Sequence, residues 1–116
     1  MRTRVPAFRF YPGDFLNDAF VRAMPANARG VYITLLCVEW IEGHLPDDLD
    51  QLARLAAVSR AEFRKVWPFV EPCFERRAGG GLYQKRLEAE RQKQAAYRER
   101  MSARGALGAE RRWGSH

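Results

Sequence analysis

Apolar residues recur at helical spacing in the stretch from residue 27 to residue 43. Its apolar positions form a wide arc made up of Val31, Tyr32, Leu35, Leu36, Val38 and Trp40. Pro25 suits the first turn of a helix and Gly43 suits its end, so we predict a central helix that is covered on two sides. A glycine costs stability inside a helix, and Gly30 therefore leads us to expect that another segment approaches closely there.

Two shorter amphipathic patterns follow, separated by a polar turn. The first, "DLDQLARLAAV", brings Leu49, Leu52, Leu55 and Ala56 to one face, and the pair Asp47–Asp48 supplies N-cap residues. The second, "RAEFRKVWPFV", opens with Ser59 and Glu62 in the spacing of a capping box. Its predicted inward stripe is Phe63, Val66, Trp67 and Val70.

We expect Pro68 to end or kink the second of these helices early. Two short helices joined by a tight turn predict a helix-turn-helix. The next stretch, "CFERRAGGGLYQKRL", indicates two short strands around a glycine loop at residues 78–81. The predicted fold class is mainly α (α+β): a winged helix-turn-helix with a small β-hairpin wing and a polar C-terminal helix.

The sequence divides into three predicted parts. Residues 1–88 form the winged-helix-like domain, residues 89–104 a polar charged helix, and residues 105–116 a flexible basic tail. Gly105 and Gly108 are expected to end the helix, whose apolar positions, Leu87, Tyr97 and Met101, are sparse. Such a helix either docks lightly, projects into solvent or pairs with a second chain, so a homodimer is one expected partner.

Four aromatic residues fall within eight positions near the N-terminus, in "FRFYPGDF". They predict either a hydrophobic plug for the helical core or a platform on which ligand rings stack. We favour the plug, with Phe10, Tyr11 and Phe15 capping the open end of the core, because only Arg9 is interleaved with them. Asp14 is the expected N-cap of a short helix there.

Composition is that of a globular protein, with 47% apolar and 29% charged residues among 116. No stretch approaches the roughly 18–20 apolar residues of a membrane span, so we expect a cytoplasmic protein with no membrane partner. Net charge is +6, and residues 76–116 carry eleven basic and four acidic residues. Concentrated positive charge favours a polyanionic partner, DNA before membrane.

The chemistry-bearing residues do not indicate an enzyme, a metal site or a cofactor. Cys37 and Cys73 are interpreted as buried core thiols, because their spacing with the histidines matches no zinc pattern. The acidic group Asp47, Asp48 and Asp50 is a conceivable metal or acid/base cluster, although helix capping explains it as well. No nucleophile-and-base set and no phosphate-binding glycine loop is present in the sequence.

DNA contacts are predicted on three elements. Helix residues would enter a major groove, wing residues would follow the phosphates, and tail residues would form an arm. The predicted DNA-binding residues are Arg60, Arg64, Lys65, Arg76, Arg77, Lys85, Arg86, Arg104, Arg111 and Arg112. A continuous basic face over the helix and the wing would favour DNA, whereas an interrupted one would favour a protein partner.

The chain resembles the YdaU-like family of phage and prophage proteins, a domain of unknown function. The resemblance rests on "FYPGDFL" (10–16), "RGVYITLLCVEW" (29–40), "LPDDLDQLARLAAVS" (45–59), "VEPCFE" (70–75), "LYQKRLEAE" (82–90) and "SARGALGAERRWG" (102–114). It implies a winged-helix-like domain of proteins associated with phage replication in a bacterial host, similar to replisome organisers.

The residues and the resemblance together predict a non-catalytic DNA-binding protein of phage or prophage origin, acting in replication initiation or replisome organisation. One alternative is a protein-interaction adaptor that docks a phage or host replication protein. A transcriptional regulator would use the same DNA-binding parts.

Overall fold

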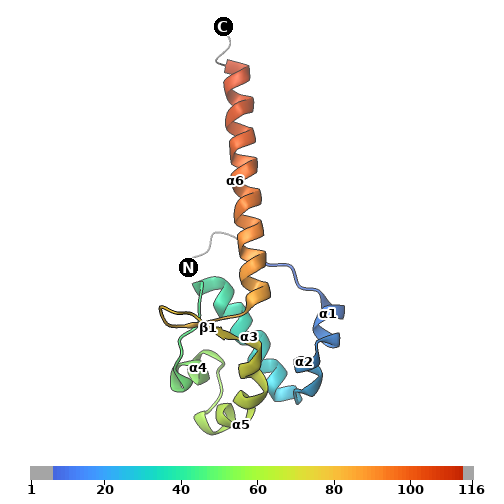
Figure 1. The fold of residues 1–116 in the computed structure, drawn as a ribbon, viewed down its shortest axis with the longest axis vertical. Coiled ribbons are helices and arrows are strands. Elements are labelled where there is room, and N and C mark those ends of the chain that lie inside the picture. Colours follow the sequence, from blue (N-terminus) through green and yellow to red (C-terminus); the bar gives the residue numbers. More distant parts are fainter. Residues whose placement is uncertain (1–6, 114–116) are drawn as a thin grey trace.

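The computed structural model describes residues 7–113, and their side chains through residue 105. A globular part made mostly of helices is followed by one long helix that projects away from it, so the molecule measures 69 × 30 × 24 Å (Figure 1). The elements in chain order are α1 (Pro12–Asn17), α2 (Ala19–Ala23), α3 (Ala26–Glu42), α4 (Leu49–Leu55), α5 (Arg60–Val70), the 3-10 turn η1 (Glu71–Cys73), β1 (Glu75–Arg76), β2 (Leu82–Tyr83) and α6 (Lys85–Trp113).

Helix α3 is the centre of the globular part, as its wide apolar arc predicted. It packs against α4, α5 and α6, and the arc is buried except for half-buried Val38. The helix begins after Pro25 and ends at Gly43, whose φ of 92° places it in the left-handed region that terminates helices. The expected close approach at Gly30 is wrong for the described residues, because none of them lies within 4 Å of a Cβ placed there.

The pair α4 and α5 is held by the predicted caps. The Asp48 side chain accepts a hydrogen bond from the Gln51 amide at 3.0 Å, and the Ser59 hydroxyl accepts one from the Glu62 amide at 3.1 Å. The predicted inward stripe of α5 is buried throughout. In α4 only part of the predicted face is buried, because Leu49 and Leu55 remain 41% and 38% exposed.

Pro68 lies inside α5, which continues to Val70, so the predicted early end of this helix is wrong. A proline removes one backbone hydrogen bond and costs about 3 kcal/mol in a helix interior. Burial of Val66, Trp67 and Val70 on the adjoining turns offsets this cost, since each fully buried apolar side chain contributes about 1.5–3 kcal/mol.

The strands β1 and β2 form the predicted antiparallel hairpin, with Arg76 opposite Leu82. Leu45 joins this sheet through an isolated bridge in which its N–H and C=O bond the C=O and N–H of Leu82 at 2.9 and 2.7 Å. The glycine loop is required for this approach. Gly81 has a φ of +90°, and a Cβ on it would lie 3.0 Å from the Leu45 carbonyl oxygen.

Short helices at the N-terminus begin differently from the prediction. Tyr11 and Pro12 start α1, and Asp14 lies in its first turn rather than at its N-cap. Asp18 is the acidic cap here: its side chain accepts from the amides of Phe20 and Val21 at 2.8 and 3.2 Å, and so starts α2.

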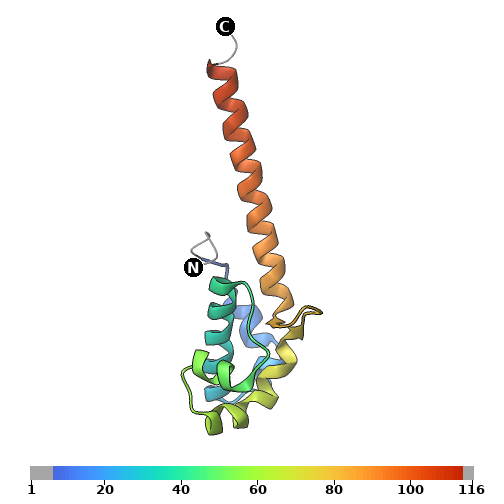
Figure 2. The same ribbon diagram turned by 90° about the vertical axis from the view of Figure 1, so that its left-hand side faces the viewer.

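Helix α6 begins directly after the hairpin at Lys85 and runs to Trp113 (Figures 1 and 2). The predicted helix end at Gly105 and Gly108 is therefore wrong, and the predicted tail of residues 105–116 is helical through residue 113; residues 114–116 lie outside the described part. Gly105 does not adopt the left-handed conformation that ends helices, and no described residue lies within 4 Å of a Cβ placed on it. None of the helices within residues 7–113 combines the length and apolarity needed to cross a membrane.

Two glycine substitutions should change stability in opposite directions. Gly30→Ala should raise the free energy of unfolding by about 0.5–1 kcal/mol, because alanine has the better helix propensity and the added methyl meets nothing. Gly81→Ala should lower it by about 1–3 kcal/mol, because its positive φ and the nearby Leu45 carbonyl both oppose a side chain. Urea unfolding followed by tryptophan fluorescence measures both, and a stabilising Gly81→Ala would contradict the hairpin geometry.

Candidate nucleic-acid interface

The three predicted cations of α5 are all exposed, as their position opposite the buried stripe requires. Arg60 is held by an ion pair to α4, with its Nε 2.9 Å from Asp50 Oδ1. Arg64 and Lys65 have no ion pair to any other residue whose side chain is described. The exposed face of α5 therefore presents two cations that are available to an anion.

The two arginines of the hairpin are paired with acids. Arg76 Nε lies 2.9 Å from Asp47 Oδ2, and its Nη2 lies 2.8 Å from Glu71 Oε2. These hydrogen bonds, first that of Glu71 and then that of Asp47, raise the pKa of Arg76. Arg77 Nη2 lies 3.2 Å from Glu88 Oε2, and its guanidinium lies 4.7 Å from the ring centre of Tyr83.

The remaining predicted cations belong to α6. Lys85 and Arg104 are exposed, and Arg86 lies 3.9 Å from Asp14. Arg111 and Arg112 lie in the helical part of α6, but their side chains are outside the described residues. Acidic groups thus interrupt the basic face over α5 and the hairpin, while residues 85–105 of α6 carry seven basic and three acidic residues.

The three neighbouring aspartates that the sequence analysis considered as a cluster each make a different interaction. Asp47 pairs with Arg76, Asp48 caps α4, and Asp50 pairs with Arg60. Across the described side chains, no group of three or more histidine, cysteine or acidic residues is arranged to hold a metal ion. Cys73 is half-buried but Cys37 is exposed, so the prediction of two buried thiols is wrong for Cys37.

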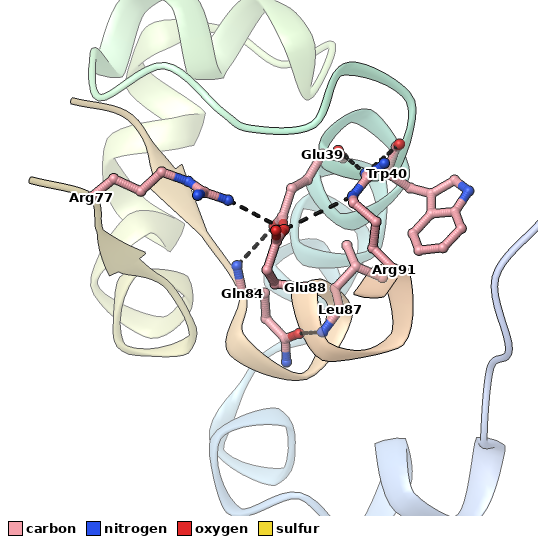
Figure 3. Close-up of polar contacts among 7 residues, drawn as sticks. All are labelled: Glu39, Trp40, Arg77, Gln84, Leu87, Glu88 and Arg91. Atoms are coloured by element: carbon pink, nitrogen blue, oxygen red, sulfur yellow. Dashed lines mark hydrogen bonds and ion pairs between the residues drawn. The ribbon is translucent and has the colours of Figure 1, made fainter. Parts of the chain in front are cut away.

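A polar cluster that the sequence analysis missed joins the base of α6 to α3 and the hairpin (Figure 3). Glu39 is completely buried, and its Oε1 accepts from the Gln84 amide at 2.9 Å. Arg91 donates through Nη2 to the carbonyls of Glu39 and Trp40, and its guanidinium lies over the Trp40 ring. Glu88 Oε2 forms ion pairs with both arginines of the cluster, at 3.2 Å from Arg77 Nη2 and 3.9 Å from Arg91 Nε.

Burial raises the pKa of Glu39 to about 8. The Gln84 amide opposes this shift, and the nearby Glu88 carboxylate adds to it. Burial likewise raises the pKa of Cys73 to about 11 and that of Tyr32 further above its usual range. A sequence signal for Glu39 does exist, since it lies four residues after Leu35 on the buried stripe of α3, where a charged residue is unusual.

The N-terminal aromatic residues divide between the core and the surface. The ring centre of Phe15 lies 6.1 Å from that of Tyr32, and that of Phe8 lies 5.3 Å from that of Trp40. Phe10 and Tyr11 remain 46% and 49% exposed. The predicted plug is therefore confirmed for Phe15 and wrong for Phe10 and Tyr11, which line a surface hollow together with Arg86 and Glu90 of α6. Figure 1 shows the N-terminal segment passing the lower part of α6 on its way to α1.

Comparison with known proteins identifies one family. Residues 6–91 match the model of a family described as "Protein of unknown function (DUF1376)". No curated protein and no solved structure matches the chain.

Stability should fall as pH rises through the neutral range because of Glu39. The folded state keeps a proton up to about pH 8, whereas the unfolded chain releases it near 4.5, so the free energy of unfolding decreases between these values. The limiting slope is about 1.4 kcal/mol per pH unit. Glu39→Gln should flatten this dependence in urea unfolding from about pH 5 to pH 8. The exposed Glu99→Gln is the control, and an equal slope in Glu39→Gln would contradict the assignment.

Proposed function

We propose that this chain, which belongs to the uncharacterised DUF1376 family, is a non-catalytic DNA-binding protein of the winged-helix type. The observation that carries the proposal is the outer face of α5. There Arg64 and Lys65 are exposed and unpaired among the described residues, on a helix that the buried Phe63 and Val66 fix to the core. Two adjacent cations on a rigid exposed helix match the way recognition helices approach DNA.

The arrangement around α5 supports the winged-helix interpretation. Helix α3, the pair α4 and α5, and the hairpin follow each other in the order that such domains have, and Leu45 adds a third strand position beside β2. In Figure 1, α4 and α5 lie at the end of the globular part that is remote from the projecting helix, where a duplex has access.

Binding would use each element differently. The N-terminal half of α5 would enter the major groove, where Arg64 can donate to guanine O6 and N7 or to a phosphate. Arg76 and Arg77 would exchange their acidic partners for backbone phosphates as the hairpin follows the strand. The ion pairs of Arg76 are exposed and weak, so their exchange costs little. Arg77 would have to leave Glu88, whose Oε2 is buried, and this exchange costs more.

A role in phage or prophage replication initiation is the finer part of the proposal. It is supported by the resemblance of "FYPGDFL", "LPDDLDQLARLAAVS" and "LYQKRLEAE" to the YdaU-like proteins. In this role the protein would act in the bacterial cytoplasm and mark a DNA site for a phage or host replication protein.

The basic face over α5 and the hairpin is interrupted, which is the outcome that the sequence analysis associated with a protein partner, and it favours a second candidate function, that of a protein-interaction adaptor. Asp47, Asp50 and Glu71 lie among the cations of α5 and the hairpin and pair with two of them. Alternating positive and negative charges bind a phosphate backbone weakly, because the acids repel it, but they can complement a protein surface that also carries both positive and negative charges.

Arg64→Ala and Lys65→Ala test the DNA interface. Arg64→Ala should weaken binding to a labelled duplex by about 1–3 kcal/mol if it loses a base contact, and Lys65→Ala should reduce the salt slope by about 1. Arg60→Ala is the matched control on the same helix and should change less, because Asp50 already holds Arg60. Fluorescence anisotropy at several salt concentrations gives both quantities. Equal, small effects of all three substitutions would exclude α5 as the interface.

Removing the interrupting acids separates the two candidate functions. Asp47→Asn with Asp50→Asn should tighten duplex binding and steepen its salt dependence, because Arg60 and Arg76 then meet phosphates without competition. Asp48 is left in place because it caps α4. An adaptor predicts the opposite: no duplex binding in either protein at low salt, and a partner captured by the parent protein but lost by the double variant.

A further inference from the structure

A groove that the sequence did not predict runs between the N-terminal segment and one face of α6. Two adjoining hollows form it, and Phe8, Arg9 and Glu90 line both. The outer hollow has a volume of about 820 Å³, within the range of about 300–1,000 Å³ that is usual for ligand sites. We call this feature the aromatic–basic groove.

Aromatic rings line both hollows, and those of Phe10, Tyr11 and Tyr97 are exposed to solvent, whereas Phe8 and Phe15 are half-buried. Phe10 and Tyr11 line the inner hollow at 46% and 49% exposure, and Tyr97 of α6 lines the outer hollow at 55% exposure. The wall that carries Phe10 and Tyr11 is fixed at both ends, since Phe8 packs on Trp40 and Phe15 packs on Tyr32. The rings are therefore presented by an ordered segment.

Positive charge surrounds these rings. The cations that line the two hollows are Arg9, Arg86, Lys93, Arg98 and Arg100. Glu90 is the one acid among the described lining residues, and its carboxylate accepts from Gln94 Nε2 at 2.9 Å. Of the five cations, only Arg86 has an ion pair with another described side chain, at the long distance of 3.9 Å from Asp14.

We propose that the aromatic–basic groove binds single-stranded DNA, with bases stacked on Tyr11 and Tyr97 and the phosphates held by the surrounding cations. Interleaved aromatic and basic side chains along a channel are the usual means of binding single strands without sequence preference. A duplex keeps its base faces stacked and cannot offer them to these rings. A second copy of the groove would bring like charges together, which opposes self-association.

The groove and the proposed duplex surface lie on different parts of the molecule. In both ribbon views α5 is at the end of the globular part far from the projecting helix, whereas the segment after residue 7 lies beside the base of α6 (Figures 1 and 2). The proposal therefore goes beyond the duplex surface of α5 and does not depend on it.

The test measures binding of the full chain to a labelled oligothymidylate of about 12 nucleotides, a length within the site sizes of single-strand binders. Tyr97→Ala and Tyr11→Ala should each weaken binding roughly five- to hundredfold, and Tyr97→Phe, which keeps the ring, should bind like the parent. Leu16→Ala removes an equally exposed apolar side chain of α1 outside the groove and should have no effect. A strand of the same length without bases should bind weakly to all five proteins.

Each alternative outcome is decisive. Oligothymidylate binding that survives Tyr97→Ala and Tyr11→Ala, or an equal affinity for the strand without bases, would overturn the stacking site. Duplex binding without oligothymidylate binding would overturn it too, and would leave the α5 proposal intact.

Sedimentation that shows a dimer dissociated by Tyr97→Ala would assign the groove to self-association, and displacement of oligothymidylate by a short acidic peptide with equal affinity would assign it to a protein partner. Arg64→Ala with Lys65→Ala should leave oligothymidylate binding unchanged, so failure of one surface is distinguishable from failure of the other.

Discussion

The burial of one carboxyl group fixes how the two parts of this molecule are joined. Glu39 lies on the stripe of α3 that also holds Leu35 and Trp40. Of its two carboxyl oxygens, only Oε1 has a hydrogen bond to a described residue, which it accepts from the amide of Gln84. Gln84 is the residue before α6, and its side chain accepts from the Leu87 amide at 2.6 Å. The first turn of the long helix is thus capped and docked at the same point. The other carboxyl oxygen, Oε2, is buried and accepts no hydrogen bond from a described residue. This junction is therefore stable only while the carboxyl group is protonated or its negative charge is balanced by neighbouring cations.

This junction sets the direction of α6, and that direction places one face of α6 beside the N-terminal segment. Arg91 reaches back over Trp40, and the same Trp40 ring receives Phe8 from the N-terminal segment. The Trp40 side chain of α3 is therefore contacted both by the N-terminal segment and by α6. Their approach leaves the aromatic–basic groove between them, so the groove depends on tertiary packing and on none of the local patterns in the sequence.

Much of the fold could be predicted because local physics and burial agree there. The arc of α3, the caps Asp48 and Ser59, and the glycine hairpin each have a short-range signal that the structure confirms. Failures occur where a distant contact overrides a local preference. Pro68 stays inside α5 because its neighbours are buried. The pairs Arg76–Asp47 and Arg77–Glu88 join residues 29 and 11 positions apart, and no spacing rule would have revealed them.

These ion pairs also change what the cations can do. A count of charged residues places the largest positive excess in residues 76–116, which form the hairpin and α6. The arginines of the hairpin are paired with acids, so α6 is the main source of positive potential. Phosphates attract unpaired cations at long range and reach paired ones only after displacing an acid. In the proposed DNA binding, a single strand would therefore be attracted to α6, and a duplex to the two unpaired cations of α5, Arg64 and Lys65. Under the two proposals together, the projecting helix would guide a single strand toward the aromatic–basic groove, and α5 would hold a duplex at the other end of the globular part.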